Sequence, residues 1–223
     1  MPLSGEARAP SSRPGGLTLA AIVVLAGGLF VVLFRFQHLG HLDFWWWMGL
    51  NIALVAGVGF AADPDYAARL RSDLKTGLTR KAALGLASAF VLYGLFAAGR
   101  LAALKIFPFA ASGIASVYEL KTGAGITRVA LLLGLLIGPG EEIVWRGFLQ
   151  ENLGRRLGLA GGFVLTALVY ALVHVASGNT MLVLAAAVCG VFWGLLYAAW
   201  RSPVLNAVSH TVWALVIFIL LPF

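Results

Sequence analysis

The chain has 223 residues, of which 61% are hydrophobic and 11% are charged, and its mean hydropathy is +0.92. Soluble domains carry about 25% charged residues, and a soluble protein of this size could not cover its surface with so few charges. The composition therefore excludes a water-soluble enzyme and a disordered chain. An integral membrane protein remains, and the length fits a single domain.

The chain is also basic, with a net charge of +7. In a soluble protein this excess would suggest nucleic-acid binding. In a membrane protein, basic loops that face anionic lipid and the cytoplasm account for it. We therefore expect the lipid bilayer as a partner, and no nucleic acid.

The first 16 residues are rich in Pro, Ser and Gly, and 1–16 are predicted to form a disordered tail ahead of a single transmembrane domain over 17–223. The apolar run that follows is too long for the core of a signal peptide, about 7–15 residues, so we interpret it as a retained span. Six later segments approach the ~20 residues that a helix needs to cross the hydrocarbon core. The predicted spans are 17–34, 44–62, 82–104, 126 onward, 159–176, 181–200 and 203–223. The expected fold class is all-α, a polytopic bundle of about seven spans with an intramembrane active-site cavity.

Two polar or mixed segments separate these spans. Residues 63–81 form the longest polar stretch and carry five basic side chains, and 106–125 are mixed and expected to lie along the interface. With seven spans and the N-terminus inside, the inner segments hold more Lys and Arg than the outer ones. The positive-inside rule then predicts a cytoplasmic N-terminus.

Ionisable groups inside apolar spans are costly, so each is a candidate site residue. Of nine acidic residues, seven lie in tails or loops, and the other two, Glu141 and Glu142, are adjacent inside the fourth span. The preceding Gly138-Pro139-Gly140 is expected to interrupt the helix. A new helix N-terminus there would offer free N–H groups to the carboxylates.

Helical spacing separates the two carboxylates. Glu142 and Arg146 are four residues apart and can form an ion pair on one helix face. Glu141 is rotated by about 100° and can point elsewhere. The pair is therefore interpreted as one structural and one reactive carboxylate. The alternative is that all three charges only neutralise one another and fix helix packing.

Histidines supply the remaining candidates. His38 and His41 lie near Asp43 in a spacing like that of a metal site, although interfacial histidines are also common. His174 and His210 lie within apolar spans. A lone membrane histidine is more often a packing residue, but two of them beside a buried carboxylate pair favour a catalytic site.

These residue types together are suited to peptide hydrolysis without a covalent nucleophile. A carboxylate can act as general base on water, one histidine can hold that water, and a second can donate to the oxyanion. The sequence has no HExxH pair, no GxSxG motif, and no aspartate after Asp73. Zinc proteases of that class, serine hydrolases and paired-aspartate proteases are therefore disfavoured.

The chain resembles the CPBP family of intramembrane proteases, also called the CAAX-protease, bacteriocin-processing or Abi family. The family pattern is EExxxR, FxxxH and HxxxN or HxxxD on successive helices. Residues 141–146 match the first motif, and 170–174 match the second with Tyr170 in place of Phe. His210 opens the third motif, but Ala214 stands where Asn or Asp is expected. The resemblance covers about residues 80–223.

The resemblance implies roles for individual residues. Glu141 is expected to be the catalytic base, His174 its partner in activating water, and His210 the oxyanion donor. Glu142 and Arg146 are expected to support them.

Ala214 removes one polar group that the family pattern supplies. Asn206 lies one turn before His210 and could replace it, because residues four apart share a helix face. The alternative is that Asn206 caps the last helix near Pro203. No cofactor is expected, because one carboxylate and two histidines form a sparse ligand set. A divalent metal held by Glu141, His174 and His210 is the alternative.

The expected function is therefore a glutamic-type intramembrane endopeptidase, a hydrolase acting on a membrane-associated or lipid-linked protein or peptide. C-terminal sorting tails or CAAX-like ends are candidate substrates, and a bacterial inner membrane is the expected location. One alternative is a non-catalytic immunity or adaptor protein on the same scaffold. Another is a proton-coupled transporter, since buried Glu and His also form proton relays.

Overall fold

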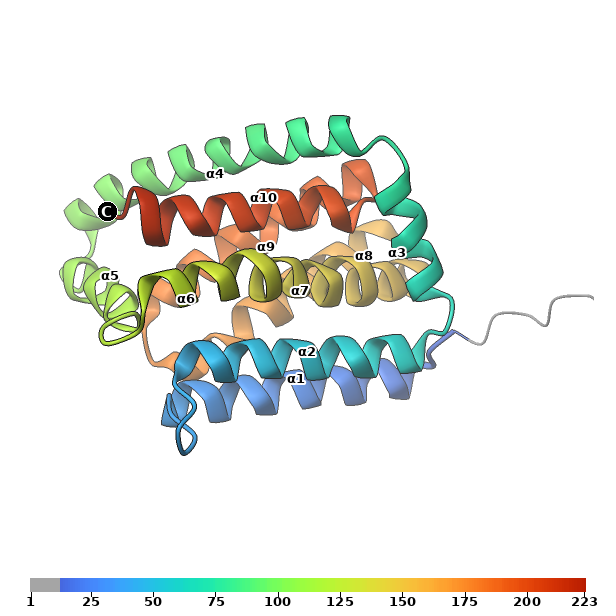
Figure 1. Ribbon diagram of the computed structural model, residues 1–223, viewed down its shortest axis with the longest axis horizontal. Helices are drawn as coiled ribbons and strands as arrows, with labels where there is room; N and C mark the ends of the chain where they lie inside the picture. Colours follow the sequence, from blue (N-terminus) through green and yellow to red (C-terminus); the bar gives the residue numbers. More distant parts are fainter. Residues whose placement is uncertain (1–12) are drawn as a thin grey trace, which may run out of the picture.

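The computed structural model describes residues 13–223, so most of the predicted disordered tail lies outside the described residues. The described part is an antiparallel bundle of helices without strands, and confirms the all-α prediction (Figure 1). The elements in chain order are α1 Gly16–Phe36, α2 Phe44–Ala62, α3 Tyr66–Lys75, α4 Leu78–Ile106, α5 Ala110–Glu119, α6 Ile126–Leu132, η1 Leu133–Ile137, α7 Gly138–Glu142, η2 Ile143–Gln150, α8 Glu151–Val173, η3 Val175–Ser177, α9 Thr180–Trp200, α10 Pro203–Leu215 and η4 Val216–Leu220.

Six helical runs in the described part are long and apolar enough to cross a membrane, and one of them, Ile126–Ser177, has 52 residues. A straight helix of that length would extend about 78 Å, more than twice the ~30 Å hydrocarbon core. The run reverses direction at Gly158, whose φ of 78° and ψ of 163° are not helical. A Cβ on Gly162 would lie 2.4 Å from the Gly154 backbone nitrogen, so the two arms pack directly against each other. Two crossings from this run bring the total to seven, in agreement with the predicted number.

The fourth span is not interrupted at Gly138-Pro139-Gly140, and that expectation is wrong. Backbone angles stay helical, and α7 lies between two π-helical turns, η1 and η2. Pro139 has no N–H to donate, and the hydroxyl of Thr211 donates instead to the carbonyl of Gly134, 3.4 Å away. Side chains of neighbouring helices can satisfy a backbone group that a proline leaves free, so the helix continues.

The glycines of this segment allow close helix packing. A Cβ on Gly138 would lie 2.9 Å from the Thr211 hydroxyl, and one on Gly140 would lie 2.4 Å from Ile52 Cγ2. Small residues let neighbouring helices approach in a membrane, where packing must replace the hydrophobic driving force. The two glycines thus bring α10 and α2 against the helix that carries Glu141 and Glu142.

The two ends of the bundle are closed by short amphipathic segments: α3 crosses one end, and α5 lies at the other (Figure 1). Asp73 of α3 accepts from Ser202 Oγ at 2.9 Å and from the Val204 N–H at 3.0 Å, which fixes the start of α10. Arg156 donates to the carbonyl of Pro14 at 2.8 Å. The start of α1, α3, the start of α8 and the start of α10 therefore share one end.

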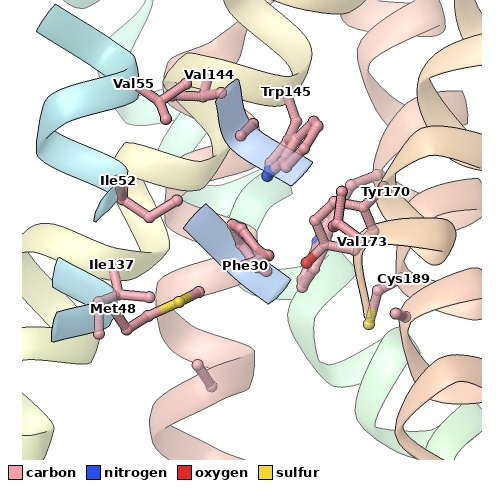
Figure 2. Close-up of a cluster of buried hydrophobic side chains, with 14 of the residues drawn as sticks. Phe30, Met48, Ile52, Val55, Ile137, Val144, Trp145, Tyr170, Val173 and Cys189 are labelled. Atoms are coloured by element: carbon pink, nitrogen blue, oxygen red, sulfur yellow. The ribbon is translucent and has the colours of Figure 1, made fainter. Parts of the chain in front are cut away.

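The buried core joins α1, α2, η2 and α8. Val55 and Val144 lie on one side of it, Trp145 and Tyr170 on the other, and Phe30 of α1 stands between them (Figure 2). The rings of Trp145 and Tyr170 meet edge to face with centroids 5.4 Å apart. The aromatic side of this core leads directly to the buried polar residues.

Candidate active site

Glu142 is completely buried and has three side chains within hydrogen-bond distance of its carboxylate. Arg146 Nη1 donates to Glu142 Oε1 at 2.9 Å, as the four-residue spacing predicts. His210 Nδ1 lies 2.8 Å from the same oxygen, and Asn206 Nδ2 donates to Oε2 at 3.2 Å. A buried carboxylate with this many partners holds α7, η2 and α10 together.

Arg146 is also fully enclosed, with 1% of its surface exposed. Its Nη2 donates to the carbonyl of Cys189 at 3.3 Å, and its guanidinium carbon lies 4.8 Å from the ring centroid of Tyr170 and 5.5 Å from that of Trp193. A cation between aromatic faces is attracted by their quadrupoles, most strongly where water is excluded. Arg146 therefore links η2 to α8 and α9.

Glu141 points away from this network, as its rotation on the helix predicts. It is 3% exposed, and within residues 13–223 one hydrogen bond reaches it: the hydroxyl of Tyr170 donates to Oε2 at 2.7 Å. A carboxylate accepts at about four lone-pair sites, so Glu141 keeps more free acceptor capacity than Glu142.

His174 lies on the same side as Glu141 and is joined to it through Tyr170. Its ring centroid is 5.0 Å from that of Tyr170, and its Nδ1 is 2.7 Å from the Tyr170 carbonyl oxygen. A carbonyl can only accept, so Nδ1 carries the proton. In the neutral ring, Nε2 is then an acceptor that can bind a water.

His210 lies on the other side, beside Glu142. Its ring stacks on Trp193 with centroids 3.9 Å apart and planes at 18°. With Nδ1 turned to Glu142, Nε2 is the nitrogen left for a ligand. The two histidines thus flank the adjacent carboxylates from α8 and α10.

Asn206 takes neither of the two roles expected for it. Its amide nitrogen donates to Glu142 and, at 2.8 Å, to the carbonyl of Trp193, so it is not free to replace the donor missing at Ala214. Ser202 caps α10 instead, accepting from the Leu205 N–H. Asn206 is part of the buried network around Glu142.

The sequence reasoning did not identify three aromatic residues of this site. Tyr170 was noted only as a replacement for Phe, although its hydroxyl is the hydrogen-bond partner of Glu141. Trp145 and Trp193 pack against Tyr170 and His210. Trp145 could have been found, because it follows Glu141 by four residues and shares its helix face. No local pattern indicates Trp193, whose position depends on helix packing.

Of the predicted cluster of His38, His41 and Asp43, the aspartate has other partners. Asp43 caps α2 by accepting from the Trp46 N–H and forms an ion pair with Arg128. Within residues 13–223, no group of three or more His, Cys, Asp or Glu side chains is placed to hold a metal ion.

A cavity of about 320 Å³ lies next to the candidate site, between α4, α5, α9 and α10. Its lining is largely apolar and includes Phe96, Val188 and Trp213. Glu141, Glu142, His174 and His210 do not line it. Trp213 connects the two regions, because its ring meets that of His210 edge to face at 6.3 Å.

Residues 123–216 match a protein family described as type II CAAX prenyl endopeptidase Rce1-like. The resemblance to the CAAX-protease family is confirmed. The matched region is less than half of the chain, and it contains all six candidate site residues, Glu141, Glu142, Arg146, His174, Asn206 and His210. No curated protein and no solved structure matches the chain. Residues 123–216 are thus similar to a family of proteases, and the six long apolar helical runs of the described residues indicate an integral membrane protein.

Proposed function

We propose that the protein is a glutamate-dependent intramembrane endopeptidase that cleaves a membrane-associated protein or peptide. The observation that carries the proposal is the difference between the two carboxylates. Among the described residues, Glu142 is engaged by three side chains, whereas Glu141 has one hydrogen bond, from Tyr170, which also contacts His174. The match to a CAAX endopeptidase family over these residues supports the same activity.

In the proposed reaction, Glu141 takes a proton from a water whose other contact is Nε2 of His174. The water oxygen attacks the scissile carbonyl carbon and forms a tetrahedral intermediate. The C–N bond then breaks, and the proton held by Glu141 passes to the leaving nitrogen. A carboxylate that accepts and returns one proton leaves the enzyme unchanged after each turnover.

His210 is proposed to donate from Nε2 to the oxyanion. Its Nδ1 is turned to the carboxylate of Glu142, which leaves Nε2 as the nitrogen that can face the oxyanion. Glu142, Arg146 and Asn206 hold His210 in position. The proposed mechanism uses no metal, because Glu142 is already neutralised by Arg146 and the remaining donors are one carboxylate and two histidines.

The cavity beside Trp213 supports an apolar substrate. Its walls suit a hydrophobic tail, and Trp213 brings it next to His210. We propose that the apolar part of the substrate lies there while the peptide reaches Glu141. CAAX-like ends and C-terminal sorting tails both have an apolar segment beside the cleavage site.

We further propose that the N-terminus faces the cytoplasm of a bacterial cell. The end of the bundle where α1 begins carries more basic residues than the other end. At the first end lie Arg13, Arg69, Arg71, Lys75, Arg80, Lys81, Arg155, Arg156 and Arg201; at the second lie Arg35, Arg100, Lys105, Lys121 and Arg128. The positive-inside rule places the first end in the cytoplasm.

The test compares protein termini in membranes from cells that express wild type, Glu141→Gln or Glu119→Gln at equal abundance. Glu119 is exposed on α5 and is the matched control. New termini near an apolar or lipid-linked tail, present with wild type and Glu119→Gln but absent with Glu141→Gln, are expected. Identical termini in all three strains would overturn the proposal and favour a non-catalytic role, to which Ala214 already points.

A further inference from the structure

Six buried polar side-chain atoms have no hydrogen-bond partner among the described protein atoms. Three of them belong to η2 and α8: Nε of Arg146, Oε1 of Gln150 and Oγ1 of Thr166. The other three are the indole nitrogens of Trp145 and Trp213 and Oδ1 of Asn206. Arg146, Gln150 and Thr166 are 1%, 3% and 1% exposed. Buried polar groups are almost always hydrogen-bonded, because leaving one unpaired costs the full desolvation of that group. Three such atoms in one region therefore point to a common partner.

The packing of η2, α8 and α9 brings these atoms together. A Cβ on Gly162 would lie 2.9 Å from the carbonyl of Gln150, so these two residues lie at the same level of the bundle. Thr166 is one turn further along the buried face of α8, and Tyr170 one turn beyond it contacts Arg146. Thr166 thus lies level with the region between Gln150 and Arg146.

The third helix that packs around these side chains is α9. The amide nitrogen of Gln150 donates to the carbonyl of Gly194 at 2.9 Å, and Arg146 Nη2 donates to that of Cys189. A Cβ on Gly194 would lie 3.5 Å from Gln150 Oε1, so glycine leaves that oxygen uncovered. The side chains that carry these three atoms therefore lie where η2, α8 and α9 pack together.

The donor and acceptor types match one kind of ligand. Arg146 Nε–H can only donate, Gln150 Oε1 can only accept, and the Thr166 hydroxyl can do both. A water molecule has two protons and two lone pairs, and buried waters typically make about three hydrogen bonds. We infer that Arg146, Gln150 and Thr166 form an internal hydration site, and that water reaches Glu141 through it.

The site lies between the candidate carboxylate and one end of the bundle. Glu151, the residue after Gln150, accepts from Tyr197 at 2.9 Å and pairs with Arg155 and Arg201, whose side chains are 41% and 39% exposed. In the other direction, Tyr170 joins Arg146 to Glu141. Polar groups thus continue from the basic end to Glu141, while apolar helix faces surround them.

A hydrolase inside a membrane consumes one water per turnover and must obtain it across an apolar shell. The hydration site itself follows from the unpartnered atoms. Its use as the source of the hydrolytic water rests on the proposed function. The experiment below therefore has one readout that needs no substrate and another that does.

The first readout is X-ray hydroxyl-radical footprinting of the purified full-length protein in nanodiscs. Cys189 and Tyr170 are the reporters, because both are buried and both contact Arg146. Met48 is equally buried in the core and reports labelling caused by helix opening. Bound water yields radicals beside the reporters, so wild-type Cys189 and Tyr170 are expected to label faster than Met48.

Two substitutions at one position isolate the hydroxyl. Thr166→Val keeps the shape and is expected to lower labelling of Cys189 and Tyr170 several-fold, whereas Thr166→Ser keeps the hydroxyl and the labelling. Thr211→Val is the matched control, because its hydroxyl already donates to Gly134. Reporters that label no faster than Met48, or labelling unchanged by Thr166→Val, would overturn the inference.

Thermal unfolding gives an independent check. In a dry site, Thr166→Val would remove an unpaired hydroxyl and raise Tm. In a hydrated site it removes a hydrogen bond to water, and Tm is expected to stay equal or fall. A raised Tm for Thr166→Val together with unchanged labelling would show that the site is dry.

The second readout is cleavage of an internally quenched, farnesylated CAAX peptide by the same variants. Thr166→Val is expected to lower kcat several-fold with KM unchanged, and Thr166→Ser to restore it. If the wild-type protein is labelled as expected but does not cleave the peptide, the hydration site is retained and the proposed function is contradicted. Cleavage that persists without labelling would overturn the hydration site alone.

Discussion

Glu141 and Glu142 are neighbours in the sequence and similarly buried, yet their surroundings are opposite. Glu142 is held by Arg146, His210 and Asn206, whereas Glu141 meets one hydroxyl, that of Tyr170. Rotation by about 100° per residue sends the two carboxylates to different helices. The carboxylate with three partners fixes the structure, and the one with a single partner keeps more lone pairs for a ligand.

The two carboxylates also face different helices. Glu142 faces α10 and Glu141 faces α8, so each histidine belongs to a different carboxylate. For Glu141, His174 and His210 to form a single site, their side chains would have to contact one common ligand. Substitutions that affect only one carboxylate therefore test directly whether the two carboxylates have separate roles.

The largest expected effect is that of Glu141→Gln on peptide cleavage. A general base contributes about 10²–10⁴-fold to rate, so kcat should fall by that factor while the unfolding temperature stays near that of wild type. Cleavage of the farnesylated CAAX peptide and thermal unfolding measure the two quantities. Equal loss of stability in this variant would mean that Glu141 is structural too.

Breaking the Glu142 network should instead destabilise the fold. Arg146→Met leaves a buried carboxylate without its cation, and removal of one partner of a buried pair costs about 3–5 kcal/mol. The double variant Glu142→Leu with Arg146→Met should recover much of that loss. Reversible unfolding in detergent mixtures measures the free energy of unfolding of each variant. A double variant that loses more stability than the two single variants lose together would contradict the pairing.

Blocking the cavity next to Trp213 should change substrate binding. Val188→Trp fills the cavity and should raise KM roughly 10- to 100-fold for a substrate with a bulky apolar tail, as expected for lost burial of ~1.5–3 kcal/mol. Val191→Trp is the control, since Val191 lies on the same helix, is similarly exposed and does not line the cavity. Equal KM values for the two variants would place the substrate elsewhere.

Tyr170→Phe should have a smaller effect, because it removes only the hydrogen bond to Glu141. One such bond contributes about 1 kcal/mol net, so kcat should change by less than about tenfold. Phe is also the residue that the CAAX-protease pattern has at this position. A loss as large as that of Glu141→Gln would instead make the hydroxyl part of the reaction.

The smallest expected effect concerns a carboxylate outside the membrane. Burial alone would raise the pKa of Asp63, but the hydrogen bond and charge of Arg69 and the amide of Asn152 outweigh it and lower the pKa below 3.8. The resulting stability is present at pH values above the pKa of Asp63 in the unfolded chain, and it is lost as pH falls below about 4. For a partly exposed pair it should stay under about 1 kcal/mol. Unfolding at pH 7 and pH 3 should differ less in Asp63→Asn than in wild type.

Much of the fold could be predicted from local patterns. The limits of the second span, 44–62, agree with the structure, because a tryptophan-rich start capped by Asp43 and a polar stretch after Ala62 mark both ends. The break at Gly138-Pro139-Gly140 was wrong, because the donor that satisfies the Gly134 carbonyl comes from Thr211, more than 70 residues away. Helix breaking is a local tendency that a distant side chain can override.

The sequence by itself determined the all-α fold class, the approximate number of spans, the Glu142–Arg146 pair and the two buried histidines. Apolar length and four-residue spacing act within one helix, so no tertiary information is needed. Only the tertiary structure decided which histidine faces which carboxylate, that Tyr170 contacts Glu141, and that Asn206 joins Glu142. These contacts depend on how helices rotate and pack, and that is fixed by side chains far apart in the chain.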